Sequence, residues 1–91
     1  MSQVDKKDTY EKVVGIIAHK LSIDSQTISE ASTLHDLGAD SIDLVKIIMS
    51  LEEQFSISID DAKAETLKNV GDVVDYVYQL SLQNKANSTN E

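Results

Sequence analysis

The chain has 91 residues, which suffice for one compact domain with a single small core and leave no room for a second. Sixteen acidic residues against eight basic ones give a net charge of −8, which disfavours nucleic acid and anionic membranes as partners and favours basic protein surfaces. The chain contains no cysteine, no tryptophan and a single phenylalanine, so disulfides, a thiolate nucleophile and a cysteine metal site are excluded and the core must be aliphatic.

Residues 1–7 are polar and contain no apolar stretch of the kind that a signal peptide requires. Elsewhere in the chain no apolar run approaches the roughly 18 residues of a membrane-spanning helix. We therefore expect a cytoplasmic protein without a membrane span.

A first helix is predicted from Thr9, which can cap it, to about Leu21, after a frayed segment over residues 1–7. Apolar residues at spacings of three and four give this helix one core face: Tyr10, Val13, Val14, Ile17 and Leu21. Residues 22–40 then form a long polar loop, which must be held to the core at intervals. Four scattered apolar side chains are expected to hold it: Ile23, Ile28, Leu34 and Leu37.

The second helix, predicted over about residues 41–54, is apolar on two sides. One arc of it forms a complete core face: Leu44, Ile47, Ile48, Leu51 and Phe55. The opposite side carries a narrow apolar strip: Ile42, Val45 and Met49. Lys46, Glu52 and Glu53 border this apolar strip, and an apolar strip with charged edges is typical of a docking surface.

The remaining segments are shorter. Residues 56–59 alternate like a strand but have no partner of comparable length, so we expect an extended connection. Asp60 or Asp61 can cap a short helix through about Glu65, and Asn69 opens a last helix. Five residues of that helix repeat the core spacing: Val70, Val73, Val74, Val77 and Leu80.

Together these segments predict an all-α fold, a small bundle of three main helices and one short helix, with the long loop between the first and second helices. The composition becomes polar after Leu82. We therefore expect a folded domain over residues 1–82 and a disordered tail over residues 83–91.

The segment before the second helix is the most informative for function. Gly38 can turn the chain, Asp40 is a good N-cap, and Asp43 adds the negative charge that a helix N-terminus favours. Ser41 therefore offers its hydroxyl at the start of a helix whose exposed N–H groups favour anions. This is a suitable place for a covalently attached phosphate group.

Leu-Gly-Ala-Asp-Ser at residues 37–41, with Leu-Glu-Glu at residues 51–53 behind it, resembles the attachment site of acyl carrier proteins. The resemblance extends from about Thr9 to about Leu80. In that family the serine carries a 4'-phosphopantetheine arm, so the resemblance implies that Ser41 is the attachment residue. Peptidyl carriers usually have Gly-Gly-His-Ser at this place, and Asp40 therefore points to the fatty-acid type. Because the sequence contains no synthase domains, we expect a freestanding carrier.

The resemblance also implies partners and a role. A phosphopantetheinyl transferase would use coenzyme A and Mg²⁺: Ser41 Oγ attacks the phosphorus joined to pantetheine, and adenosine 3',5'-bisphosphate leaves. Asp40 would help to hold the metal in the joint complex, although the isolated chain is expected to hold none. The protein would be a monomeric carrier and not an enzyme, presenting a growing fatty acyl thioester to the enzymes of fatty acid biosynthesis.

Charge supports contact with basic partner surfaces. Eight acidic residues and two lysines lie between Asp36 and Glu65, so most of the net negative charge is concentrated there. The residues expected to dock partners are Asp40, Ile42, Asp43, Val45, Met49, Glu52, Glu53 and Asp61. The resemblance further implies an acyl-chain cavity between the second and third helices, lined by Leu51, Ile59, Ala64, Leu67 and Val73. The same five residues would form an ordinary core if no chain enters.

Three positions depart from the family's common pattern. Ile42 replaces a frequent leucine, Lys46 a frequent acid, and Asp60 a frequent proline. These three departures bear on which partner enzymes the protein binds more than on attachment of the arm at Ser41.

Other functions remain open from the sequence. The cargo could be a polyketide, aminoacyl or specialised lipid acyl group, and an acidic helical adaptor with an unmodified serine would show the same apolar strip. A serine hydrolase is disfavoured because neither His19 nor His35 lies at a motif spacing that would supply a base. A calcium loop is disfavoured because the acids around Gly38 do not occupy the required positions.

Overall fold

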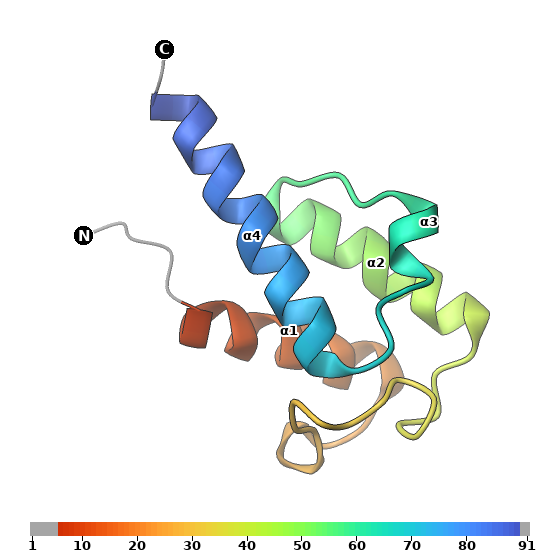
Figure 1. Cartoon of the computed structure of the whole chain (residues 1–91). Coiled ribbons are helices and arrows are strands. Elements are labelled where there is room, and N and C mark those ends of the chain that lie inside the picture. Colours follow the sequence, from red (N-terminus) through yellow and green to blue (C-terminus); the bar gives the residue numbers. More distant parts are fainter. Residues whose placement is uncertain (1–5, 90–91) are drawn as a thin grey trace.

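The structure, a computed structural model, describes residues 6–89, and the side chains of residues 6–83. It contains four α-helices and one 3₁₀ turn in this part of the chain: α1 (Lys6–Leu21), η1 (Ser25–Thr27), α2 (Ser41–Phe55), α3 (Asp61–Ala64) and α4 (Val70–Thr89). The long helices α2 and α4 both pack on α1, and the single turn of α3 lies beside the first half of α2 (Figure 1). The predicted all-α bundle with one short helix is confirmed.

The core is aliphatic, as the composition predicts. Its eight most deeply buried side chains come from α1, α2 and α4 and are Val13, Ile17, Ile47, Leu51, Val70, Val73, Val74 and Val77. The four valines of α4 form one continuous buried face, and this packing offsets the low helix propensity of β-branched residues.

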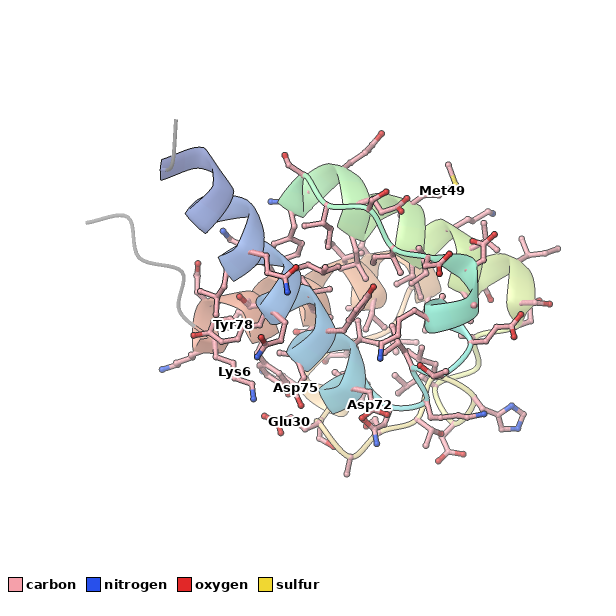
Figure 2. The ribbon with its side chains drawn as sticks, turned by 45° about the horizontal axis from the view of Figure 1, so that its top comes forward. Lys6, Glu30, Met49, Asp72, Asp75 and Tyr78 are labelled. Atoms are coloured by element: carbon pink, nitrogen blue, oxygen red, sulfur yellow. The ribbon has the colours of Figure 1, made fainter. Side chains whose placement is uncertain are left out.

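Helix α1 already includes Lys6, three residues before the expected cap at Thr9. Thr9 is buried within the first turns and does not start the helix. Near the start of the described helix, Lys6 pairs with Asp75 of α4, so an exposed ion pair joins the two helices (Figure 2). The hydrogen bond and charge of Asp75 raise the pKa of Lys6, so Lys6 keeps its positive charge to a higher pH than an ordinary lysine does. Of the expected frayed segment, residues 6 and 7 are helical and residues 1–5 lie outside the described part.

The long loop is held to the bundle by side chains and by backbone. Ile28 and Leu34 are buried, and Ile23 and Leu37 are partly buried against the core, so all four expected anchors are confirmed. Backbone hydrogen bonds also join residues 30–34 to residues 68–71, and we call this contact the clasp. Its bonds are Leu34 N to Lys68 O (3.1 Å), Val70 N to Ser32 O (2.9 Å) and Gly71 N to Glu30 O (3.0 Å).

Helix α2 ends at Phe55, one residue later than predicted. Ser56 adopts the left-handed conformation (φ 55°), and its N–H and that of Ile57 both donate to Glu52 O, which closes the helix. The extended connection after the helix is confirmed and forms no strand. Its Ile59 side chain is buried against the core.

The last two helices differ in how they begin. Asp60 occupies the N-cap position of α3 but its side chain makes no capping hydrogen bond. Asn69 caps α4 as predicted, because its Oδ1 accepts from Asp72 N at 2.8 Å. Beyond Leu82, where a disordered tail was expected, the backbone of α4 remains helical through Thr89, and residues 90–91 lie outside the described part. Residues 83–89 contain neither glycine nor proline, the residues that most often end a helix.

Candidate functional site

The start of α2 is fixed by a reciprocal pair of hydrogen bonds. Asp40 Oδ1 accepts from Asp43 N at 2.9 Å, and Asp43 Oδ2 accepts from Asp40 N at 3.3 Å. Gly38 precedes this capping box in a left-handed conformation (φ 91°), which a side chain would strain. The predicted turn and N-cap are therefore confirmed.

This arrangement leaves Ser41 available. Ser41 is the first residue of α2 and is exposed, and its hydroxyl makes no hydrogen bond to any part of the chain that the structure describes. The two carboxylates do the capping that a serine often does at a helix start. The hydroxyl at this position is therefore free to react.

Two pockets open on either side of Ser41, and Leu44, Ala64 and Glu65 line both of them. The larger pocket, of about 430 Å³, lies between α2 and α3. It is also lined by Val45, Ile48, Met49, Glu52, Ile59 and Asp61. The smaller pocket, of about 230 Å³, lies toward the clasp. It is also lined by Leu34, His35, Ala39, Asp40, Leu67 and Lys68.

The residues expected to line an acyl cavity divide between these pockets and the core. Ile59 lines the larger pocket, Leu67 the smaller, and Ala64 both. Leu51 and Val73 line neither, because they are 0% and 1% exposed and fill the space between the long helices. In place of Leu51, the α2 wall of the larger pocket comes from Leu44, Val45, Ile48 and Met49.

The apolar strip is exposed as predicted. Ile42, Val45 and Met49 are 66%, 56% and 59% exposed, and Met49 points away from the bundle (Figure 2). Three large apolar side chains in solvent on one helix are unusual on a small protein and typical of a contact surface.

The acidic residues around the apolar strip are not equivalent. Glu52 Oε2 accepts from Ile59 N at 2.7 Å, so this carboxylate ties α2 to the connection before α3. Asp61 is exposed beside the larger pocket, whereas Glu53 lines a groove on the other flank of α2. Neither ion pair found in the described part of the chain involves these three acids.

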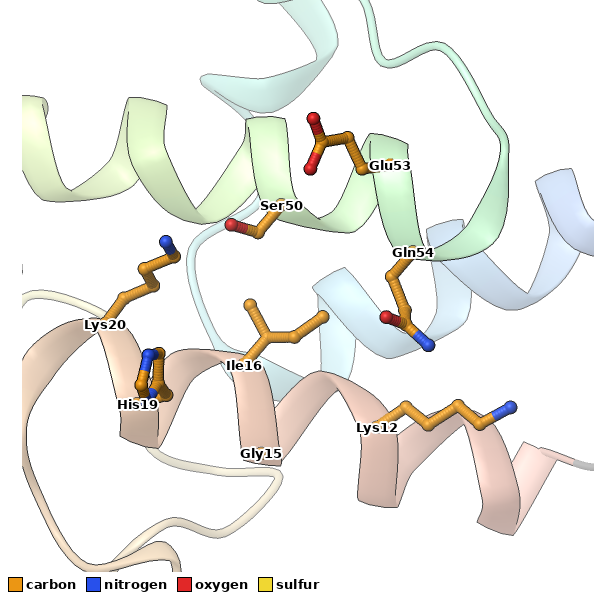
Figure 3. A pocket seen from close by; sticks show the side chains of 8 residues that line it. All are labelled: Lys12, Gly15, Ile16, His19, Lys20, Ser50, Glu53 and Gln54. Carbon is orange, nitrogen blue, oxygen red and sulfur yellow. The ribbon is translucent and has the colours of Figure 1, made fainter.

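That groove, of about 640 Å³, lies between α1 and α2 and was not anticipated from the sequence (Figure 3). Lys12, His19 and Lys20 line its α1 side, opposite Ser50, Glu53 and Gln54. It does not include Ser41. Basic residues of α1 thus face the acidic helix across a groove that is separate from the two pockets.

The described residues include no group of three or more histidines or acids placed to hold a metal ion. Asp36, Asp40 and Asp43 do not come together as a calcium loop would require. Over the same residues, no helix combines the length and the apolar character needed to cross a membrane.

Comparison with known proteins gives the class of protein. A family described as "Phosphopantetheine attachment site" matches residues 11–77, a range that contains Ser41 and both pockets. The fold and this match define a small helical carrier domain that bears 4'-phosphopantetheine. At 52% identity over 69 residues, the chain is similar to the acyl carrier protein of Clostridium acetobutylicum, with 75% of this chain and 90% of that protein covered. The acyl carrier protein of Thermotoga maritima is 44% identical over 73 residues, covering 79% and 90%.

Solved structures of acyl carrier proteins are also similar to this chain. The acyl carrier protein of Enterococcus faecalis matches with a TM-score of 0.72 and 29% identity, over 85% of this chain and 99% of that one. The crystal structure of the Thermotoga maritima acyl carrier protein matches with a TM-score of 0.77 and 29% identity, over 91% and 98%. The chain belongs to the acyl carrier proteins, whose standard role is in fatty acid synthesis.

Proposed function

We propose that Ser41 carries the 4'-phosphopantetheine arm of this acyl carrier protein as a phosphodiester. The observation that supports this most directly is the hydroxyl at the first position of α2, left free by the Asp40–Asp43 capping box and flanked by two pockets. The arm supplies a terminal thiol, which forms the acyl thioester. The chain itself contains no cysteine that could do so.

The attachment needs a partner enzyme, because nothing in the described part of the chain acts as a base toward Ser41. His35 lines the smaller pocket with Ser41, but no hydrogen bond joins them. A phosphopantetheinyl transferase would take the Ser41 proton while the Oγ–phosphorus bond forms and the bond to adenosine 3',5'-bisphosphate breaks. Asp40, beside Ser41, is the carboxylate we propose as a contact of the transferase Mg²⁺. The carrier is the substrate in this step and not the catalyst.

The larger pocket is the place we propose for the acyl chain. Its walls are mostly aliphatic, and Ile48, Ile59 and Ala64 at its base are buried. An acyl chain entering it would be removed from water, which favours binding by about 0.8 kcal/mol for each buried CH₂ group. Leu51 and Val73 would support this pocket from behind.

Partners would approach the apolar strip. Ile42, Val45 and Met49 offer a small apolar contact, and Asp61 and Glu53 offer carboxylates on its two sides. Charge-guided association with a small apolar contact gives fast binding and fast release, as a carrier serving several enzymes requires. We propose that it works as a cytoplasmic monomer with the enzymes of fatty acid synthesis.

Intact-mass measurement tests the attachment. The protein is incubated with coenzyme A, Mg²⁺ and a broad-specificity transferase, beside Ser41→Ala and Ser58→Ala. We expect the mass increment of one phosphopantetheine in wild type and Ser58→Ala, and none in Ser41→Ala. An unmodified wild type would refute the proposal and favour an acidic helical adaptor. The acyl groups recovered on protein from its native cell then decide between a fatty acyl and another cargo.

A further inference from the structure

The smaller pocket beside Ser41 contains two basic side chains in a region dominated by acids. His35 and Lys68 line it together with Ser41. Both residues are exposed, and among the described residues neither side chain takes part in an ion pair or a hydrogen bond. They are therefore available to an anionic group at Ser41.

The clasp holds these two residues at the pocket. Lys68 O accepts from Leu34 N at 3.1 Å, which fixes the backbone of residue 68 beside the residue that precedes His35. His35 O accepts from Gly38 N at 3.0 Å within the turn that leads into α2. Two distant parts of the chain thus reach the same pocket through backbone contacts that do not depend on either side chain.

The two pockets differ in charge. The larger pocket is lined by the acids Glu52, Asp61 and Glu65 and by no basic residue. The smaller pocket contains Asp40 and Glu65 but adds the two basic residues. The Asp40 carboxylate is already engaged as the helix cap. A phosphodiester carries a full negative charge, so it is repelled from the larger pocket and accommodated at the smaller one.

We propose that Lys68 and His35 hold the phosphodiester of the arm at the mouth of the smaller pocket, and so leave the larger pocket to the acyl chain. This inference rests on the proposed attachment at Ser41. Lys68 supplies a permanent positive charge, and His35 supplies an N–H donor in either protonation state. Both are positioning residues for the arm and take no part in its chemistry.

Phosphorus NMR of the modified protein tests the inference. Wild type, Lys68→Gln and His35→Ala are first modified and checked by intact mass, with Lys46→Gln as the matched control. Lys46 is an exposed lysine of α2 that lines neither pocket. We expect the phosphodiester resonance to shift and its transverse relaxation to slow in Lys68→Gln and His35→Ala, because a released phosphate moves more freely. Lys46→Gln should match wild type.

The outcomes separate the two proposals. If the arm is attached and all four proteins give the same phosphorus spectrum and relaxation, the inference is wrong and the proposed function stands. If Lys46→Gln changes the signal as much as Lys68→Gln, general charge explains the effect and the inference is also wrong. A wild type that takes up no arm overturns the proposed function and this inference with it. Circular dichroism of each variant confirms that these surface substitutions leave the helices intact.

Discussion

Asp40 has two separable roles at the start of α2. In the isolated chain its carboxylate caps the helix through Asp43 N, and the reciprocal bond from Asp43 completes the capping box. In the proposed complex with the transferase, the same carboxylate contacts Mg²⁺. A cap needs only an oxygen that accepts a hydrogen bond, whereas Mg²⁺ prefers a charged oxygen. Substitutions at this residue can therefore separate stability from modification.

Asp40→Asn should retain most of the stability and lose most of the modification rate. The asparagine side-chain oxygen can still accept from Asp43 N, while Asp40→Ala removes the cap and should lower the free energy of unfolding by about 1 kcal/mol. Urea unfolding measures the first effect, and the rate of mass increment with coenzyme A measures the second. An Asp40→Asn variant modified as fast as wild type would show that the carboxylate has no part in the transferase step.

Ser81 differs from Asp40 because its side-chain oxygen is buried and makes no hydrogen bond within the described part of the chain. It is 9% exposed on α4, and its Oγ has no hydrogen-bond partner among the described residues. Burying an unpaired hydroxyl opposes folding. Ser81→Ala should therefore raise the free energy of unfolding by about 1 kcal/mol, seen as a higher urea midpoint. Ser58→Ala, at a position nearer the surface, should leave the midpoint unchanged, and a less stable Ser81→Ala would contradict the argument.

At the scale of elements, α2 is organised as two faces with different tasks. Ile47 and Leu51 belong to the buried core, while the apolar strip on the opposite side is exposed. Glu52 connects the helix to the next segment, because it holds the N–H of Ile59 and so positions the connection that leads to α3. Substitution of Glu52 would therefore disturb the fold as well as any docking, and the apolar strip is the cleaner place to test docking.

Met49→Ala should slow transfer of acyl groups to partner enzymes without changing stability. Met49 is 59% exposed, so its truncation removes little from the core. At an interface, loss of a central apolar contact costs about 1 kcal/mol or more, which corresponds to about a fivefold lower rate of transfer at limiting carrier concentration. Leu82→Ala, at an exposed position of α4 away from the apolar strip, is the control. Equal rates for both variants and wild type would refute docking at the apolar strip.

At the scale of the whole molecule, charge is unevenly distributed. Four of the eight basic residues lie on α1, whereas eight of the sixteen acidic residues lie between Asp36 and Glu65. The two ion pairs found in the described part, Lys6–Asp75 and Lys12–Asp8, lie outside that acidic segment. Repulsion among its carboxylates therefore opposes folding and, at the same time, attracts basic partners.

Salt should raise the melting temperature and lower the rate of association with partner enzymes. From about 0.01 M to about 1 M NaCl the Debye length falls from ~30 Å to ~3 Å, which screens repulsion within the acidic segment and attraction between molecules. The exposed ion pairs weaken in parallel, but such pairs contribute little to stability. Thermal unfolding and stopped-flow mixing measure the two effects. A melting temperature that falls across this range would mean that attractive pairs dominate the electrostatics of the fold.

The sequence by itself determined the features that depend on neighbours within about four residues. The periodicity of Val13 and Ile17 or of Ile47 and Leu51, the cap at Asp40 and the exposed apolar strip all follow from helical geometry. The same local reasoning placed the start of α1 at Thr9, whereas Thr9 lies buried inside a helix that already includes Lys6. Composition predicted a disordered tail after Leu82, whereas the backbone of α4 is helical through Thr89.

Only the tertiary structure decided the surroundings of Ser41. The clasp joins two segments far apart in the sequence and so brings Lys68 to the pocket that contains His35. The tie from Glu52 to the connection before α3 places Ile59 at the larger pocket, while Leu51 remains in the core. These contacts depend on the course that the loops take across the bundle. The loops have no regular spacing of apolar residues, so their course cannot be predicted from local sequence patterns. A helix start can be predicted from a short run of residues, but the pockets beside it require the whole chain.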